Sequence, residues 1–462
     1  MHNNQSRRSF LKRASALSVA GVAAPWALNL AAMAEASAAT ASDYKALVCV
    51  FLYGGNDYAN TLVPYDGASY AAYQQMRPSF AYANAALSPT VLKPSATPLD
   101  SSGMAHTYAL APELAPLASL FNAGKLGVIL NIGNLTQPTT KAQYSAKSVP
   151  LPPKLFSHND QQSFWQASSP EGATSGWGGR IGDLFEAGNG NATFTSVNVS
   201  GNAVFLSGRT TAQYQVTTNG PVALNGIKSN LFGSSAATEA LRSLITQPRT
   251  HVLENEYNRV VKRSLDANTI LTTSLAGAQP LATVFPASNS LADQLKMVAR
   301  MISAAPALGA KRQVFFVSMG GFDNHDAMLT AHPGLMTKLG AAMAAFYAAT
   351  VELGVADQVT TFTASDFGRT LTGNSDGSDH GWGTMSFVMG GAVQGQRFYG
   401  VPPVVANGGV DDVGQGRLLP TTSVDQFAAT MGKWMGVSDS QLLSMLPKLN
   451  NFNASTRNLG FV

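Results

Sequence analysis

The sequence predicts an α/β protein with one mostly parallel central sheet and helices on both of its faces. Continuous apolar runs, typical of strands buried on both faces, alternate along the chain with segments of helical periodicity. Three of these runs are followed by a loop that pairs glycine with aspartate. Residues 185–235 differ, because they are rich in Asn, Gly, Thr and Ser, and they predict a small β insertion or a cap over the sheet.

Five runs predict the main strands. The first covers residues 46–53 and ends at Gly54-Gly55-Asn56-Asp57. It contains Cys49, whose apolar neighbours predict a small buried side chain. The other four are predicted at residues 127–132, 314–318, 359–364 and 386–389. Shorter runs at residues 194–199 and 203–207 predict strands within the insertion.

Helical patterns separate these strands. Ser423 and Gln426 are spaced as a capping box at the start of the last of them. No linker composition marks a second domain, so residues 39–462 are predicted to form one domain. The helices are predicted at residues 112–124, 154–167, 238–275 with a break near Pro248, 290–305, 335–353 and 424–435.

The amino-acid composition excludes several kinds of site and partner for this protein. Hydrophobic residues make up 45% of the 462 residues and charged residues only 12%, against about 25% charged in an average soluble domain. The single cysteine excludes an intramolecular disulfide and a cysteine-based zinc site. The net charge of +4 is carried mostly by residues 1–38, because 26 basic and 25 acidic residues remain beyond them. This balance argues against a nucleic-acid partner bound through its phosphates.

The N-terminus predicts an export signal. Residues 6–12 read Ser-Arg-Arg-Ser-Phe-Leu-Lys, the twin-arginine pattern, and a moderately apolar stretch follows. Ala36-Ser37-Ala38 is the predicted cleavage site, with residues 34–36 as the alternative. We therefore expect residues 1–38 to engage the twin-arginine export machinery and the mature chain to be periplasmic or secreted. No later stretch reaches 18 uncharged apolar residues, so no stable membrane span is predicted in the mature chain.

Acidic residues and histidines gather where strands are predicted to end. Asp57, Asp323 and Asp366 each follow a strand, and His325 and His380 lie in the same loops or close to a strand. Ligands of open α/β sheets bind at the carboxyl ends of the strands. Carboxylates crowded there repel one another unless a cation holds them, and Asp with neutral His suits Zn²⁺, Mn²⁺ or a similar ion. We therefore predict a divalent metal site from these five residues, with turn capping as the alternative use of each.

Arg369 follows the Asp366 loop. Its guanidinium could bind a phosphate or sulfate in a bidentate manner, or it could be a structural arginine. A redox enzyme is disfavoured, because no G-x-G-x-x-G follows a strand and no cysteine cluster is present.

Four segments together resemble a known family. They are residues 51–57, 156–162, 320–325 and 365–370 with 379–382. In these segments the chain resembles the exported proteins of domain of unknown function family 1501, within the alkaline-phosphatase-like clan of metallohydrolases. The resemblance extends over about residues 45–440. It implies the alkaline-phosphatase-like fold and the hydrolysis of phosphate or sulfate esters.

The resemblance also implies roles for the predicted ligands. Asp57 matches the acid that holds one metal, and Asp323 with His325 matches the ligands of the other. Asp366 and His380 match further ligands, but Phe367 stands where the clan has a histidine. The second metal site would then be empty, or be filled by Asp57, Asp366 and water around a harder ion such as Mg²⁺ or Ca²⁺. His332 is the substitute candidate for His325.

The clan's nucleophile lies at a helix N-terminus, and Ser157 has that position. Ser157 could instead cap the helix, with His158 and Asp160 as site groups. Two functions follow from these alternatives. One is an exported metallohydrolase that acts on an anionic ester. The other is a catalytically degenerate envelope or secreted binding protein, which Phe367, the uncertain nucleophile and the Asn/Gly/Thr-rich insertion favour.

Overall fold

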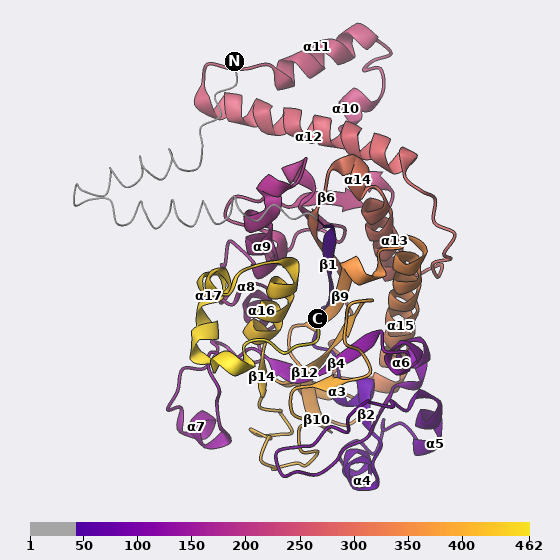
Figure 1. The fold of residues 1–462 in the computed structure, drawn as a ribbon, viewed down its shortest axis with the longest axis vertical. Coiled ribbons are helices and arrows are strands. Elements are labelled where there is room, and N and C mark those ends of the chain that lie inside the picture. Colours follow the sequence, from indigo (N-terminus) through magenta and orange to yellow (C-terminus); the bar gives the residue numbers. More distant parts are fainter. Residues whose placement is uncertain (1–42) are drawn as a thin grey trace, which may run out of the picture.

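The computed structural model describes residues 43–462, and its centre is a ten-stranded sheet (Figure 1). The predicted signal peptide, residues 1–38, lies outside the described residues. The strand order is β13-β4-β12-β9-β1-β8-β5-β6-β7, and β14 pairs with β4. Two small two-stranded sheets, β2–β3 and β10–β11, lie outside it.

The middle of the sheet is parallel. β1 (Lys45–Leu52) pairs in parallel with β8 (Arg312–Met319) on one side and with β9 (Val359–Ser365) on the other. β12 (Thr384–Met389) runs antiparallel to both β9 and β4 (Leu126–Gly133). The five predicted main strands are therefore all present, and the carboxyl ends of β8, β1 and β9 lie side by side at one edge.

Alternate side chains of β1 enter two separate apolar cores. Ala46, Val48, Val50 and Leu52 belong to the core under α6, α13 and α15. The residues between them, including Cys49, belong to the core under α8, α9 and α16. Burial raises the pKa of the Cys49 thiol well above its ordinary value. This period-two division confirms a sheet that is covered by helices on both faces.

The helices alternate with the strands as the sequence indicates. The predicted break near Pro248 separates α11 from α12. The predicted capping box is present at the start of α16, where the side chains of Ser423 and Gln426 both accept hydrogen bonds from backbone N–H groups. The helices are α3 Tyr58–Thr61, α4 Gly67–Met76, α5 Asn84–Leu87, α6 Ala115–Asn122, α7 Lys141–Ala146, α8 His158–Ala167, α9 Trp177–Phe185, α10 Asn225–Lys228, α11 Ser235–Thr246, α12 Val252–Gly277, α13 Ser290–Ser303, α14 Ala305–Leu308, α15 Met328–Glu352, α16 Val424–Met435 and α17 Asp439–Met445.

The Asn/Gly/Thr-rich segment contributes strands to one edge of the sheet. β5 (Ser196–Asn198) pairs with β8, and β6 (Tyr214–Thr217) and β7 (Gly220–Pro221) follow it outward. Residues 203–207, predicted as a strand, instead contain the 3-10 turn Val204–Leu206. Their short apolar run packs Phe205 and Leu206 into the core beside α9, which a helical turn achieves as well as a strand does. The remaining short strands are β2 Leu62–Pro64, β3 Tyr108–Leu110, β10 Arg369–Gly373, β11 Ser378–His380, β13 Phe398–Tyr399 and β14 Thr422–Ser423.

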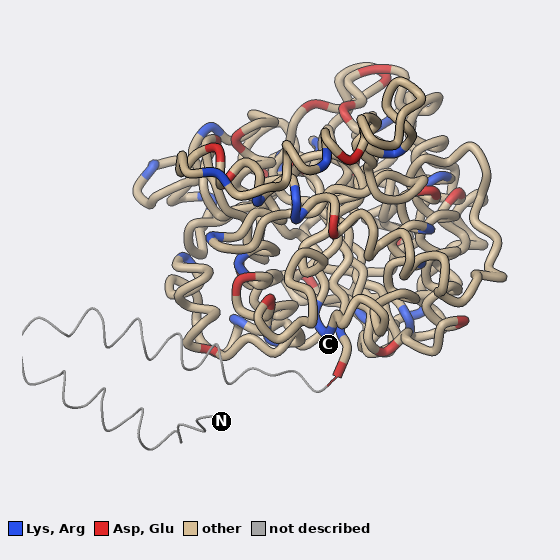
Figure 2. The backbone as a smooth tube through the Cα atoms, turned by 90° about the horizontal axis from the view of Figure 1, so that it is seen from above, with Lys and Arg blue, Asp and Glu red and all other residues tan. Residues whose placement is uncertain are grey.

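Charged side chains are few and mixed in sign, and Figure 2 shows Lys and Arg interspersed with Asp and Glu over the described chain. Three arginines are nevertheless buried, and each is paired with a carboxylate. Arg77 contacts Asp57 at 2.8 Å, Arg312 contacts Asp43 at 2.7 Å, and Arg369 contacts Asp323. The pairing is expected, because an internal charge without a partner is strongly destabilising.

Helix α15 begins seven residues before the helix predicted at 335 and is long and apolar enough, by composition, to cross a membrane. It packs along α13 and α6 over the sheet, and eleven of its residues are buried. The added N-terminal turns place His332 inside the protein, where neither ring nitrogen has a hydrogen-bond partner among the described residues. Burial lowers the pKa of His332 to about 4, although the nearby Asp57 charge opposes this shift.

His332 should therefore make the protein less stable in acid. The unfolded chain binds a proton at this histidine below its ordinary pKa of about 6.5, whereas the folded chain does so only near 4. Stability from this group is complete above about pH 6.5, and about 3 kcal/mol is lost as the pH falls to about 4. We expect His332→Leu to remove that part of the pH dependence, as measured by urea unfolding at several pH values.

His251, which is exposed, provides the matched control variant His251→Leu. The prediction fails if His332→Leu loses as much unfolding free energy on acidification as the unchanged protein and the control.

Candidate metal centre

The site lies where β8, β1 and β9 end side by side. Gly54, just after β1, has a φ of +116°, and a Cβ atom there would lie 2.4 Å from the backbone nitrogen of Asp323. The Gly54 N–H donates to Asp366 Oδ2 at 3.1 Å. Glycine thus lets the loop after β1 pass between the loops that carry Asp323 and Asp366.

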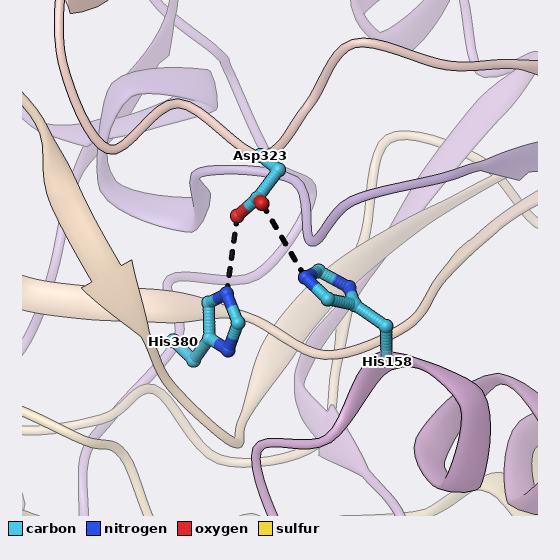
Figure 3. A group of neighbouring side chains, drawn as sticks. All are labelled: His158, Asp323 and His380. Atoms are coloured by element: carbon cyan, nitrogen blue, oxygen red, sulfur yellow. Dashed lines mark hydrogen bonds and ion pairs between the residues drawn. The ribbon is translucent and has the colours of Figure 1, made fainter.

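Three side chains from distant parts of the chain converge there (Figure 3). His158 is the first residue of α8, Asp323 follows β8, and His380 ends β11. One ligand atom from each lies within 4.8 Å of the others. Asp323 Oδ1 is 3.1 Å from His380 Nε2, and Asp323 Oδ2 is 3.4 Å from His158 Nε2. The structure therefore brings together two of the five predicted ligands and His158, which the sequence placed among the catalytic groups.

A third histidine adjoins this group. His325 Nε2 lies 3.0 Å from Asp323 Oδ1 and 3.0 Å from His380 Nε2. His325 is about half exposed, at the solvent side of the group. Three of the predicted ligands, Asp323, His325 and His380, are thus neighbours.

The other ring nitrogen of each histidine faces an acceptor. His158 Nδ1 lies 2.7 Å from Asp366 Oδ2, His380 Nδ1 lies 2.8 Å from the carbonyl of Phe156, and His325 Nδ1 lies 3.3 Å from Asp379 Oδ1. A carbonyl or carboxylate can only accept, so each Nδ1 is assigned the proton. In the neutral form, every Nε2 then presents a lone pair to the group around Asp323.

Lone pairs at this spacing repel unless a proton or a cation lies between them. Burial lowers the pKa of His380, although its bond to the Phe156 carbonyl opposes the shift, so the neutral form is favoured. The hydrogen bond to Asp366 raises the pKa of His158. Neutral imidazole nitrogens anchored at Nδ1, together with one carboxylate, are the donors that Zn²⁺ and similar ions use. The residues present therefore fit a divalent metal.

Phe367 and Arg369 contact the side chains of His158, Asp323 and His380. The Phe367 ring packs against both His158 and His380, with ring centroids 4.9 and 4.7 Å apart. The side chain of Arg369 is fully buried, and its Nη1 lies 2.5 Å from Asp323 Oδ1. Its other contacts are with the Gly54 carbonyl and Ser378. Burial raises the pKa of Asp323, but Arg369 and the histidines outweigh it and hold that pKa below its usual value.

Asp57 and Asp366, also predicted as metal ligands, are held by the protein. Asp57 Oδ1 accepts from Arg77 Nη1 at 2.8 Å and from the Asn60 N–H at 2.9 Å, and Oδ2 accepts from Ser378 Oγ at 2.7 Å. Burial alone would raise the pKa of Asp57, but Arg77, His332 and the hydrogen bond from Ser378 together hold it below its usual value. Asp57 therefore stays ionised in a buried ion pair.

Asp366 contacts His158 on the side of the imidazole ring away from Asp323. Its Oδ2 accepts from His158 Nδ1, from Gln162 Nε2 at 2.8 Å and from the Gly54 N–H, whereas Oδ1 is buried and has no hydrogen-bond partner in the described part of the chain. His158 and Gln162 are four residues apart on α8, so they project from one helix face. Asp366 thus fixes the orientation of His158.

Ser157 precedes His158 as the N-cap residue of α8, but its side chain makes no capping bond. Its Oγ donates instead to Asp160 Oδ2 at 2.9 Å. Asp160 is buried and also lies 3.5 Å from Lys154 Nζ. The hydroxyl therefore has a carboxylate that can take its proton.

Sequence reasoning did not identify three residues around the site: Arg77, Gln162 and Arg417. The spacing of Gln162 from His158 was a usable signal, because both lie within the segment 156–162. Arg417 donates through Nε to the His380 carbonyl at 3.0 Å and stacks on the Phe156 ring at 4.8 Å. No sequence signal connects Arg77 to Asp57 or Arg417 to His380, because these contacts depend on how distant loops pack.

Three comparisons with known proteins were made. A family model described as "Protein of unknown function (DUF1501)" matches residues 44–449. The search of curated proteins found no match.

Solved structures similar to this chain include the sulfatase PsFucS1 from Pseudoalteromonas sp. (9% identity, 90% of this chain and 72% of that chain, TM-score 0.33). Others are the phosphonate monoester hydrolase SpPMH from Silicibacter pomeroyi (10%, 85% and 73%, 0.31) and Ps i-CgsB in complex with k-i-k-neocarrahexaose (10%, 89% and 77%, 0.35).

Removal of one partner of the buried Arg77–Asp57 pair should strongly destabilise the protein. Arg77→Met leaves the Asp57 carboxylate buried without its cation, which should cost about 3–5 kcal/mol of unfolding free energy. In Arg77→Met/Asp57→Asn that carboxylate is absent, so the double variant should lose less than the sum of the two single losses. Urea unfolding of the four proteins measures this coupling. Strictly additive losses would contradict the pairing.

Proposed function

We propose that this chain, which belongs to the DUF1501 family of proteins of unknown function, is a metal-dependent hydrolase of phosphate or sulfate esters. The observation that carries the proposal is the set of three histidines with Nδ1 bonded to the protein and Nε2 turned toward Asp323. The family resemblance in the loops that carry these residues supports the same chemistry.

His158, Asp323 and His380 would hold the ion, with His325 as a fourth ligand. Because imidazole nitrogens dominate this donor set, it favours Zn²⁺ or Mn²⁺ over Mg²⁺ and Ca²⁺, which prefer oxygen ligands. Such an ion polarises an ester oxygen and lowers the pKa of an attacking hydroxyl or water.

The protein's own groups would bind and orient the ester. Arg417 stands beside His380, and among the described residues its Nη1 and Nη2 make no hydrogen bond to the protein, so both can donate to an anionic group. Ser157 is the candidate nucleophile, because Asp160 can accept its proton, and water is the alternative. Phe367 would exclude water beneath the two imidazoles. Arg369, predicted as an anion clamp, would act through Asp323, which it holds in place.

Export belongs to the proposal as well. The twin-arginine pattern at residues 6–12 supports delivery by the twin-arginine machinery to the periplasm or the exterior. Proteins exported by this route are folded before they cross, so a metal site could be filled in the cytoplasm.

A catalytically degenerate binding protein is the second candidate. The buried Arg77–Asp57 pair and Phe367 favour it, because they stand where the related clan would place ligands of a second metal. Metal binding without ester turnover would favour this candidate over the hydrolase.

Removal of a ligand should abolish both metal binding and turnover. Loss of a residue that only hydrogen-bonds a metal ligand lowers metal affinity by about tenfold to hundredfold. We expect Asp323→Ala and His380→Ala, which remove ligands themselves, to lower it further. Metal analysis of the purified proteins, with hydrolysis of aryl phosphates, phosphodiesters and sulfates in Zn²⁺, Mn²⁺, Mg²⁺ or Ca²⁺, measures both. His251→Ala, an exposed histidine far along the chain, is the control. Unchanged metal content and unchanged hydrolysis in both ligand variants would overturn the proposal.

Asp366 should act through His158. Asp366→Asn keeps the shape of the side chain but removes the charge that holds the Nδ1 proton, so metal affinity should fall by about tenfold to hundredfold. Zinc titration against a competing chelator measures this change. The isosteric Asp379→Asn, which alters the partner of the more exposed His325, should have the smaller effect. Equal affinity in Asp366→Asn and the unchanged protein would contradict the assigned role.

A further inference from the structure

We propose that the exposed half of α12 is a homodimer interface, on which α12 of a second copy packs in the antiparallel direction. The helix lies with α11 at one end of the molecule, beyond the edge strands β6 and β7 of the sheet (Figure 1). Four residues in the N-terminal half of α12, Leu253, Tyr257, Val260 and Ser264, form the stripe that would be covered.

The stripe continues a face of α12 that is buried elsewhere. Leu271 and Leu275 pack into the core and are 0% and 9% exposed. Eighteen residues make about five turns of an α-helix, so Leu253 and Tyr257 lie on the same face as these two. Leu253 and Tyr257 are nevertheless 72% and 65% exposed. The body of the protein therefore covers this face only along the C-terminal half of the helix.

Helix α11 does not cover the stripe. It packs against another side of α12, where Asn258 is buried and donates to the carbonyl of Gln247 at 2.7 Å. Val260 and Ser264 line one wall of a cleft of about 500 Å³, and the β6 region of the same chain lines the other wall.

Exposed apolar residues are concentrated in this part of the chain. Within residues 43–462, nine of the sixteen large hydrophobic side chains that are exposed lie between residues 222 and 270. A contiguous exposed apolar stripe, such as Leu253, Tyr257 and Val260 on one helix face, indicates an interaction surface. Phe232 is 94% exposed and Val252 is 75% exposed.

The spacing of the stripe matches a second copy of itself. Its members are separated by four, three and four residues, a pattern that reads the same in both directions. Two antiparallel copies would therefore place Tyr257 against the partner subunit's Val260, and Leu253 against the partner subunit's Ser264. A two-fold interface requires this kind of self-complementarity.

The charges beside the stripe agree with the antiparallel direction. Glu256 and Arg263 are seven residues apart and flank the same side of the stripe. In the antiparallel pair, Glu256 would meet the partner subunit's Arg263, and symmetry makes this contact twice. Glu256 already lies 3.3 Å from Arg259 in its own helix, but both side chains are more than half exposed and that contact is weak. The balanced charge also disfavours an anionic membrane as the partner.

Sedimentation velocity of the full chain over a range of concentrations tests the interface. We expect a dimer, which Tyr257→Asp converts to a monomer. Glu256→Arg should weaken the dimer by about tenfold, since two attractive pairs become repulsive. The reciprocal double variant Glu256→Arg/Arg263→Glu should restore it.

Glu239→Arg on α11, whose side chain is 71% exposed away from the stripe, is the matched control and should leave the dimer unchanged. All substituted side chains are exposed, and thermal unfolding verifies that each variant folds. A wild-type chain that remains monomeric would overturn the proposal. So would a dimer that persists in Tyr257→Asp, or a charge-reversed dimer that the double variant does not restore.

Discussion

Hydrogen bonds at Nδ1 of three histidines determine what the site can do. Asp366, the Phe156 carbonyl and Asp379 each accept from one imidazole, so its Nε2 faces Asp323. The residues that fix these rings come from segments far apart in the chain, and the parallel strands β8, β1 and β9 bring the loops together. The chemistry of the site therefore rests on tautomers that the surrounding fold imposes.

Buried arginines divide the carboxylates of this region into two groups. Arg77 neutralises Asp57 and donates to the Leu371 carbonyl, so Asp57 acts as a structural link between the loop after β1 and β10. Arg369 also contacts a carboxylate, but Asp323 remains 42% exposed and keeps contact with the histidines. Asp57 is thus a buried structural residue, whereas Asp323 is held by Arg369 and is also accessible to solvent.

The sequence predicted the main strands and three neighbouring site residues for one physical reason. Adjacent parallel strands end at the same edge, so the loop of Asp323 and His325 and the segment that runs from Asp366 to His380 could be expected together before their contacts were known. Partners set by side-chain packing could not be predicted in this way. Asp366 and His158 are 208 residues apart, and Arg77 carries no pattern that identifies Asp57 as its partner. The antiparallel direction of β12 was also beyond reach, because it depends on loop paths and not on periodicity.

The candidate metal site and α12 lie at opposite ends of the parallel strands. The candidate metal site lies at the carboxyl ends of β8, β1 and β9, whereas α12 packs on α14, which ends at Leu308 just before β8 begins at Arg312. The helix that carries the apolar stripe therefore packs near the amino ends of the strands, at the end opposite to Asp323 (Figure 1). A partner bound to α12 would leave the loops around Asp323 open to a substrate. The parallel strands that gather the ligands at one edge thus also hold the helical surface away from them.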